Sequence, residues 1–372
     1  MVVNSSGMRD VTPNNDFVSP CPDCSIFPRP AAPSQPASPA GTISTYDASC
    51  VEFTIELKLS ASVDPFLRKR EEDEGTSTSG NPFISTATRD DSDEYVASDA
   101  HEVVGKITTY ATQTLSAQYR THAFTILVCN NLARLIRWDR AGAIVTEPIY
   151  YDKDSYLYDF LTCYNNASPK VRGHDTTVSI PTSEDIEAMM KSVREPPEGP
   201  HLTVTIPVQS RSEPRRYIIS RPRARPYIPA GRWTRTSIAY DVERKKRVFL
   251  KDSWRVLVDG IRPEGDVYAL LKEKNVPNVP FCSLANDIGD ADVHRTQTDR
   301  FVGKFLEYDA PHFTAHRHYR LVLDDIGEKL ETFRKSRDMV KAVRAAILGK
   351  CHWFRNVLRI ADSYCSSPCC LQ

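Results

Sequence analysis

The chain has 372 residues, a length typical of two or three domains rather than one. Its 48 basic and 48 acidic residues balance, so no global positive field indicates a nucleic-acid partner. Hydrophobic residues make up 40% of the chain, as in globular proteins, and no apolar run is long enough to cross a bilayer. We therefore expect no membrane and no nucleic-acid partner, and the protein substrate or partner stays unknown at this point.

The cellular location is predicted from the N-terminus and the cysteines. Met1-Val-Val-Asn-Ser-Ser-Gly-Met8 lacks the basic and then apolar pattern of a secretory signal. The ten cysteines are scattered along a long chain, which is not typical of a disulfide framework. We expect an intracellular protein with reduced thiols, in the cytoplasm or nucleus.

Residues 1–178 are predicted to form a first module. Ser19 to Thr42 are rich in proline, alanine and serine, so most of this segment is predicted to be flexible or polyproline-like. Val51 to Leu59 alternate between apolar and polar residues, which predicts a half-buried strand. Residues near 68–99 are charged, rich in serine and threonine and almost free of large apolar side chains, which predicts a disordered insertion.

Two helices and three strands complete this module. Apolar residues recur at helical spacing from about Asp99 to Gln118, which predicts an amphipathic helix. A second helix is predicted around Ser155 to Tyr164. Turn residues separate the three predicted strands, which are Phe124 to Val128, Ala133 to Trp138 and Ala143 to Ile149.

Residues 179–348 are predicted to form a second module. Thr182 and Asp185 have the spacing of a capping box, which predicts a short helix through Val193. Two strands are predicted after it, Leu202 to Val208 and Arg216 to Ser220.

A lysine and a glutamate in this module carry the main functional signal. Lys251 follows the apolar residues Val248-Phe-Leu250, and Glu264 opens a helical run thirteen residues later. Protein kinases place in this order the strand lysine and the helix glutamate that hold the phosphates of ATP. The lysine supplies a cation to the phosphates, and the glutamate holds it through charge-assisted hydrogen bonds.

Several unlike motifs extend this signal in the expected order. They are Gly231-Arg-Trp-Thr-Arg-Thr236, Val248-Phe-Leu-Lys251, Glu264 and His318-Tyr-Arg-Leu-Val-Leu-Asp-Asp-Ile-Gly327. On these residues the sequence resembles the fungal-type protein kinase family. Upstream, Ile55-Glu-Leu-Lys58, Val63-Asp-Pro-Phe66 and Arg137-Trp-Asp-Arg-Ala-Gly-Ala-Ile-Val145 resemble the same family, so the resemblance covers about Pro22 to Ile347. The resemblance implies a protein-kinase-like N-lobe with a five-stranded antiparallel sheet and one main helix. It also implies ATP-dependent phosphorylation of protein serine and threonine, with ATP and Mg²⁺ as cofactors.

The resemblance also implies roles for individual residues. Lys251 and Glu264 are the expected catalytic pair, and their side chains should face each other where the helix meets the sheet. Gly231, Lys251, Leu323 and Asp325 are the expected ATP contacts: the glycine lets a backbone turn approach phosphate, and the backbone of the hinge reads the adenine.

The motifs that perform phosphoryl transfer are missing from the sequence. His294-Arg295 and His316-Arg317 are not followed by aspartate, and no Asp-Phe-Gly occurs. We expect a catalytically incomplete kinase portion, truncated early in the C-lobe, whose own binding of ATP and Mg²⁺ is weak. Residues 349–372 are predicted to be an irregular cysteine-rich tail. Because Gly349-Lys350-Cys351 can be encoded by GGT-AAG-TGT, which contains a splice-donor string, we hypothesise that this tail is translated intron.

A second functional candidate lies in the first module. Pro22-Asp23, followed later by Glu56-Leu57-Lys58, has the form of the PD…(D/E)xK signature of restriction-endonuclease-like nucleases. That chemistry needs two carboxylates to hold Mg²⁺ and a lysine to act on the attacking water. The predicted fold class is therefore α+β, a restriction-endonuclease-like module followed by the kinase-like lobe. A metal-dependent nuclease using Asp23, Glu56 and Lys58, and a non-catalytic interaction module, are the alternative functions.

Overall fold

The computed structural model describes residues 22–28, 48–66, 91–194, 196–197, 199–220, 229–301, 313–327 and 332–353, and in the helix that begins at Asp91 it describes side chains from Asp99 onward. These residues form two sheets and five α-helices, so the predicted α+β class is confirmed. No helix in the described ranges is both long and apolar enough to span a membrane.

The chain divides into two compact units, each of which gathers separate stretches of sequence. The first unit consists of Met1–Thr176, Pro222–Trp233 and Asp292–His316. The second unit consists of Thr177–Arg221, Thr234–Ala291 and Arg317–Gln372.

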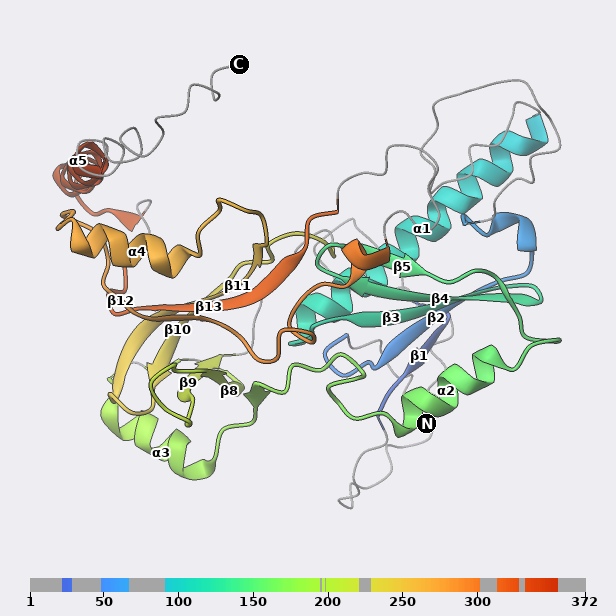
Figure 1. Ribbon diagram of the computed structural model, residues 1–372, viewed down its shortest axis with the longest axis horizontal. Helices are drawn as coiled ribbons and strands as arrows, with labels where there is room; N and C mark the ends of the chain where they lie inside the picture. The colour runs from blue at the N-terminus through green and yellow to red at the C-terminus, as the bar shows by residue number, and fades with distance from the viewer. Residues whose placement is uncertain are drawn as a thin grey trace. The chain divides into compact units, whose positions relative to one another are not determined.

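The first unit contains a six-stranded mixed sheet in the order β1-β2-β3-β4-β5, with β6 paired to β4 (Figure 1). Strands β2 and β3 are parallel and connected through α1, whereas the other neighbouring pairs are antiparallel. The elements of this unit are β1 (Cys24–Ile26), β2 (Phe53–Lys58), η1 (Ala61–Val63), α1 (Asp91–Ala117), β3 (Ala123–Cys129), β4 (Leu132–Asp139), β5 (Gly142–Val145), β6 (Ile149–Tyr150), α2 (Tyr156–Asn166) and η2 (Thr298–Phe301).

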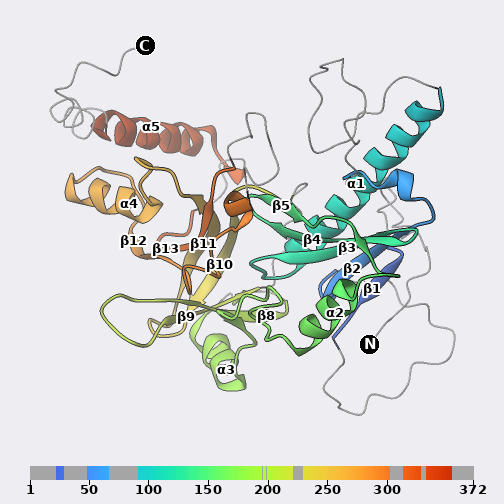
Figure 2. The same ribbon diagram turned by 45° about the vertical axis from the view of Figure 1, so that its right-hand side comes forward.

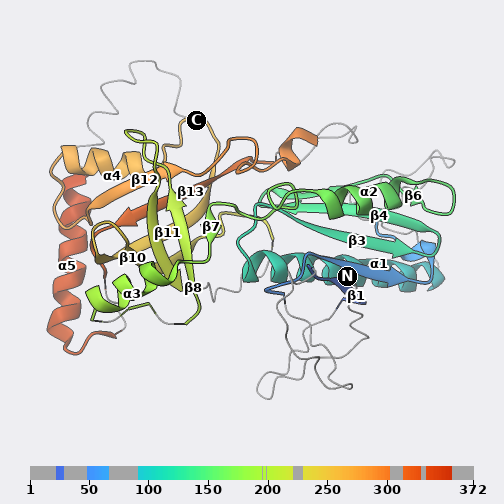
Figure 3. The ribbon, with the colours of Figure 1, turned by 90° about the horizontal axis from the view of Figure 1, so that it is seen from below.

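Different helices cover the two faces of this sheet (Figure 3). On one face, Tyr164 of α2 packs edge-on against Phe53, with ring centroids 4.9 Å apart. On the other face, the Tyr110 hydroxyl of α1 donates a hydrogen bond to Glu56. Successive side chains of a strand point to opposite faces, so β2 presents its aromatic side to α2 and its carboxylate to α1.

The prediction of a half-buried strand for β2 was wrong about which side chains are exposed. The expected solvent-facing residues Glu52, Thr54 and Glu56 are buried. Helix α1 covers the side of β2 that carries Thr54 and Glu56, whereas Glu52, just before β2, is buried against Tyr164, Arg120 and His174. Leu57 and Leu59, on the expected buried side, are 47% and 99% exposed. Alternation alone does not show that a crossover helix will cover the polar face of a parallel pair.

Two loop predictions for this unit were wrong in part. Helix α1 begins at Asp91, so residues 91–99 of the predicted disordered insertion are helical. Strand β1 lies inside the segment predicted to be flexible, and it pairs with β2. The rest of both segments lies outside the described residues.

The other strands and the second helix predicted for the first unit are confirmed, except that the third strand is divided into two short ones, whereas the restriction-endonuclease-like fold stays a prediction. The three predicted strands correspond to β3, to β4, and to β5 with β6, and the predicted helix around residue 160 corresponds to α2. The turn between β3 and β4 uses Asn130 at φ 55°, a left-handed conformation that asparagine tolerates.

The second unit contains a seven-stranded sheet in the order β12-β13-β11-β10-β9-β8-β7 (Figures 1 and 2). The sheet is wider than the five strands expected, because β8 and β7 extend it beyond β9. The elements are β7 (Val178–Ser179), α3 (Ser183–Ser192), β8 (His201–Ile206), β9 (Arg215–Ser220), β10 (Arg235–Asp241), β11 (Lys246–Val256), α4 (Glu264–Glu273), β12 (Cys282–Asp287), β13 (His316–Leu323) and α5 (Ser336–Trp353).

Helix α3 forms as its capping residues predict. The Thr182 hydroxyl accepts a hydrogen bond from the backbone N–H of Asp185, with an O···N distance of 3.1 Å. Met189 on the inner side of the helix is buried against Ile218 and Tyr240. The cap fixes where the helix starts, and the methionine fixes which side faces the sheet.

Helix α5 corrects the predicted irregular tail. The helix runs to Trp353, so residues 349–353 are helical, and 354–372 lie outside the described residues. Lys350 and His352 are in its last turn, where basic side chains complement the helix dipole. His352 lies 3.3 Å from the carbonyl oxygen of Lys274, which joins α5 to the end of α4.

Candidate functional site

Strand β11 places Lys251 on the side of the second sheet that α4 covers. Phe249, two residues earlier, packs with Tyr268 of α4 against a buried cluster on β13. Side chains two residues apart on a strand share a face, so Lys251 points the same way. Lys251 is paired with Thr236 of the neighbouring antiparallel strand β10, and this register fixes the position of Lys251 along the sheet.

Helix α4 supplies the partner of this lysine. The helix begins at Glu264, directly after Pro263, whose φ of −54° suits the start of a helix. The Glu264 Oε2 atom lies 2.6 Å from Lys251 Nζ. The predicted facing pair is confirmed, and its side chains keep 28% and 23% of their surface exposed.

The opposite face of β11 carries a buried ionic network that the sequence reasoning missed. The Asp252 carboxylate lies 2.8 Å from His318 Nε2 and 2.7 Å from Arg320 Nε. Trp254 stacks on the His318 ring, with centroids 4.9 Å apart. Burial would raise the pKa of Asp252, but the charges of His318 and Arg320 hold it well below its ordinary value.

This network ties distant strands of the sheet together. Arg320 also donates to the Thr177 hydroxyl at 2.7 Å and to the Thr205 carbonyl at 2.9 Å. The Arg320 guanidinium, on β13, thus contacts residues of β11 and β8. These contacts lie on the face of the sheet opposite Lys251. A buried charge with several fixed hydrogen-bond partners is expected to hold its neighbours rigidly.

The expected hinge contacts have structural partners of their own. The side chain of Leu323 is buried in the cluster formed with Tyr319 and Leu321. Asp325 accepts a hydrogen bond from the backbone N–H of Phe281 at 2.8 Å. The Asp325 carboxylate therefore fixes the entry to β12, and the ATP contacts expected for Leu323 and Asp325 stay predictions.

Asp324 adds a second tie at the hinge. Its carboxylate accepts from Arg244 at 2.7 and 2.8 Å and from Lys246 at 2.8 Å. Burial opposes ionisation, but hydrogen bonds from Lys246, Ser283 and Arg244 lower the pKa of Asp324 to about 2. The residue after β13 is thereby fastened to the turn between β10 and β11.

Gly231 belongs to the first unit, whereas Lys251 belongs to the second. The Gly231 N–H donates to the carbonyl oxygen of Arg140 at 2.7 Å. The glycine has a φ of 108°, and the ring of Trp233, two residues later, lies 3.8 Å from the Arg140 guanidinium carbon. In this structure the positive φ of Gly231 serves a turn whose amide is already hydrogen-bonded, and its expected phosphate contact stays a prediction.

Two of the three nuclease-like candidates, Glu56 and Lys58, are on β2, and Asp23 directly precedes β1. Lys58 Nζ lies 2.6 Å from Glu56 Oε1, and the other Glu56 oxygen accepts from Tyr110 at 3.0 Å. The Asp23 carboxylate accepts from the backbone N–H of Leu57 at 2.8 Å. Glu102 raises the pKa of nearby Lys106 through a hydrogen bond, and the charges of Glu56 and Asp23 contribute.

Comparisons with known proteins add one finding. Residues 64–358 match the profile of a family described as "Fungal protein kinase". No protein of the curated set and no solved structure shows a significant match to the chain.

Proposed function

The chain belongs to the fungal protein kinase family, and from this premise we propose that its second unit is the nucleotide-binding lobe of a protein serine/threonine kinase. The observation that carries the proposal is the 2.6 Å contact between Lys251 Nζ and Glu264 Oε2. A family match alone would be compatible with a lobe whose lysine and glutamate point apart.

The residues present fit the phosphate portion of ATP. Lys251 has three N–H donors, one of which serves Glu264, and the exposed part of its side chain can be reached by an anion. Bound ATP with Mg²⁺ would supply the phosphoryl group to be transferred. Lys251 would neutralise phosphate charge, and Glu264 would keep the ammonium group from turning away.

Phosphoryl transfer needs groups that this sequence does not provide next to these residues. A carboxylate must orient the attacking hydroxyl, and further carboxylate or amide oxygens must hold the metal. We propose that the chain by itself binds nucleotide weakly and does not transfer phosphate. Without metal ligands to neutralise the phosphates, we expect a dissociation constant for ATP above about 1 mM.

A titration of the full chain with ATP and Mg²⁺, followed by NMR of the backbone amides, tests both parts. We expect weak, saturable shifts around β11 and α4 that disappear in Lys251→Met. Lys274→Met removes a lysine that pairs with Glu273 at the end of α4, and this control should bind like the parent. Absence of any shift near Lys251 would contradict the nucleotide lobe. A micromolar dissociation constant abolished by Lys251→Met would contradict the weak binding.

A second candidate function is a metal-dependent nuclease in the first unit. It is favoured by the gathering of Asp23, Glu56 and Lys58 at neighbouring strands. It takes second place because both Glu56 oxygens already accept hydrogen bonds, so a metal ion would have to displace Lys58 or Tyr110.

The nuclease test is cleavage of DNA in the presence of Mg²⁺. A nuclease would lose cleavage in Glu56→Ala and keep it in Glu147→Ala, a control at an exposed carboxylate. Binding of a partner without turnover of DNA or ATP would instead favour the interaction module.

A further inference from the structure

Helix α4 lies in close contact with the sheet at its first turn. The Gly265 N–H donates a hydrogen bond to the hydroxyl oxygen of Tyr319, with an N···O distance of 2.8 Å. A Cβ added to Gly265 would lie 2.4 Å from the Ala285 Cβ and 2.5 Å from the Tyr319 hydroxyl oxygen. Both distances are too short for non-bonded atoms, so the close approach requires glycine at this position.

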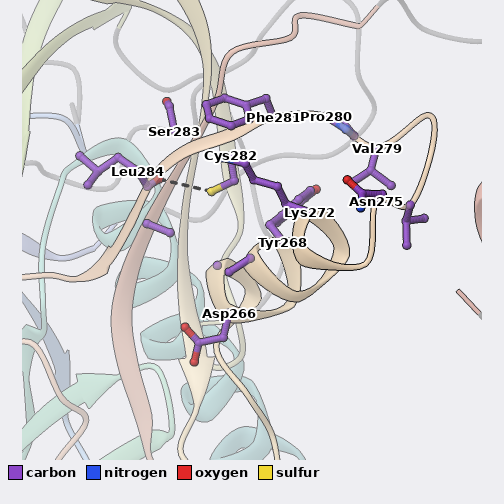
Figure 4. Close-up of a pocket in the computed structure, with 14 residues that line it drawn as sticks. Asp266, Tyr268, Lys272, Asn275, Val279, Pro280, Phe281, Cys282, Ser283 and Leu284 are labelled. Carbon is purple, nitrogen blue, oxygen red and sulfur yellow. Dashed lines mark hydrogen bonds between the residues drawn. The ribbon is translucent and has the colours of Figure 1, made fainter. Parts of the chain in front are cut away.

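Next to this contact, space opens between α4 and β12 (Figure 4). A pocket of about 660 Å³ is lined by one side of the helix, by the loop after it and by the start of the strand. Tyr268 and Lys272 from the helix, and Phe281 and Cys282 from the strand side, lie around it. Because most of a protein interior is close-packed, such a hollow leaves this side of the helix with fewer packing contacts, and the Gly265–Tyr319 hydrogen bond is one of the contacts that hold its first turn.

The acceptor in this contact is itself well fixed. Tyr319 is 4% exposed in β13 and packs with Leu321 and Leu323. The Arg255 guanidinium carbon lies 5.9 Å from the centre of its ring. Burial raises the pKa of Tyr319 to about 12, so the neutral hydroxyl is present throughout the physiological range.

We propose that Gly265 and Tyr319 are positioning residues for the Lys251–Glu264 pair. Glu264 directly precedes Gly265, so any lift of the first turn carries the glutamate away from β11 and leaves the lysine without its partner. The proposal rests on the phosphate-binding role of Lys251 for its functional meaning. The pairing itself can be measured without nucleotide.

The pairing is read out through the reactivity of the Lys251 amine. The full chain is treated briefly with an acetylating N-hydroxysuccinimide ester, and the modified fraction of Lys251 is measured by mass spectrometry. An amine held by a carboxylate reacts more slowly than a free one. Glu264→Gln should therefore accelerate acetylation by up to about fivefold, since an ion pair between partly exposed side chains is only modestly favourable.

Two substitutions then test the positioning. Gly265→Ala should raise the Lys251 rate to about the value in Glu264→Gln, and Tyr319→Phe should raise it by a smaller factor. Adding Ala285→Gly and Tyr319→Phe to Gly265→Ala removes both atoms in the way of the new methyl group, so the rate should fall back toward that of Tyr319→Phe alone. Gly105→Ala, a helical glycine with nothing within 4 Å of the added Cβ, and Tyr217→Phe, a buried tyrosine in β9, should leave the rate unchanged.

Thermal unfolding of each variant ensures that only folded chains are compared, and Tyr319→Phe removes a single oxygen in case Gly265→Ala does not fold. If Glu264→Gln accelerates acetylation but Gly265→Ala and Tyr319→Phe do not, the positioning role is overturned. If all three accelerate it while no variant and no parent chain binds ATP, the positioning role stands and the proposed nucleotide lobe fails.

Discussion

Lys251 and Asp252 are neighbours on one strand, yet they take part in opposite kinds of ionic interaction. Lys251 meets one glutamate, and both side chains keep about a quarter of their surface in solvent. Asp252, on the other face, is 4% exposed and is shared between His318 and Arg320. Two consecutive residues of β11 therefore belong to an ion pair that a ligand can reach and to a buried network that a ligand cannot reach.

The difference indicates which group stabilises the unit and which is left for chemistry. A partly exposed ion pair contributes little to folding, because water screens it and its side chains lose entropy. A buried charge with fixed partners is strongly destabilised when one partner is removed, because the others stay buried without compensation. We therefore expect substitutions on the two faces to separate stability from nucleotide binding.

The largest effect is expected for Asp252→Asn. The variant keeps the shape of the side chain but removes the negative charge that faces the buried Arg320 guanidinium, which should cost about 3–5 kcal/mol of unfolding free energy. Denaturant unfolding measures the loss. Asp287→Asn is the matched control, since its carboxylate pairs with Arg255 while 33% exposed, and it should cost less than about 1 kcal/mol. Equal losses in the two variants would erase the contrast between the faces.

Acid sensitivity should follow the same aspartate. Because the charges of His318 and Arg320 lower the pKa of Asp252 in the folded chain, its stabilisation is fully present above the ordinary aspartate value of about 4 and declines as the pH falls below it. The parent should thus lose stability in acid more steeply than Asp252→Asn, as measured by unfolding at several pH values. Parallel pH profiles would show that this carboxylate is not the group that titrates.

A smaller effect is expected for His318→Phe. The phenyl ring can still stack on Trp254, and Asp252 keeps its hydrogen bond from Arg320, so the main loss is one hydrogen bond to a charged group. Such a bond contributes about 2 kcal/mol. Denaturant unfolding of His318→Phe and Asp252→Asn compares the two losses of unfolding free energy. A larger loss for His318→Phe would show that Asp252 is not the main stabilising residue of the network.

The smallest effect on folding is expected for Lys251→Met. Loss of the exposed pair with Glu264 should change the unfolding free energy by less than about 1 kcal/mol, while the ATP-dependent shifts disappear. Denaturant unfolding and the ATP titration, both carried out on Lys251→Met, measure the two effects. A loss as large as that of Asp252→Asn would mean that Lys251 serves the fold rather than a ligand.

The sequence predicted the open pair because its signal is local. Lys251 and Glu264 are thirteen residues apart, in an order and spacing that few other arrangements share. The buried network escaped prediction because Asp252 and His318 lie 66 residues apart, and polar residues on a strand look solvated until the opposite face is known to be covered. The glycine after Glu264 was an available signal, since glycine weakens a helix unless close packing requires it.

Prediction for the first unit failed for a related reason. The polar side of β2 was expected in water, but the parallel pairing with β3 brings α1 over it and buries Glu56. The strand itself, the β3–β4 hairpin and α2 could be predicted, because their turns and apolar spacing are contained in short stretches. Which face a distant helix covers is not contained in any such stretch.

The interleaving of the two units limits how the chain can be divided for study. Cutting after Thr176 would look natural from the sequence, but it would take residues from the first unit. Thr298 would lose the Asp139 carboxylate that its hydroxyl contacts at 2.8 Å, and Gly231 would lose the Arg140 carbonyl. A fragment that starts at residue 177 would thus carry two orphaned segments with unmatched polar groups. Recombinant pieces of this protein should be made by shortening its ends, never by halving it.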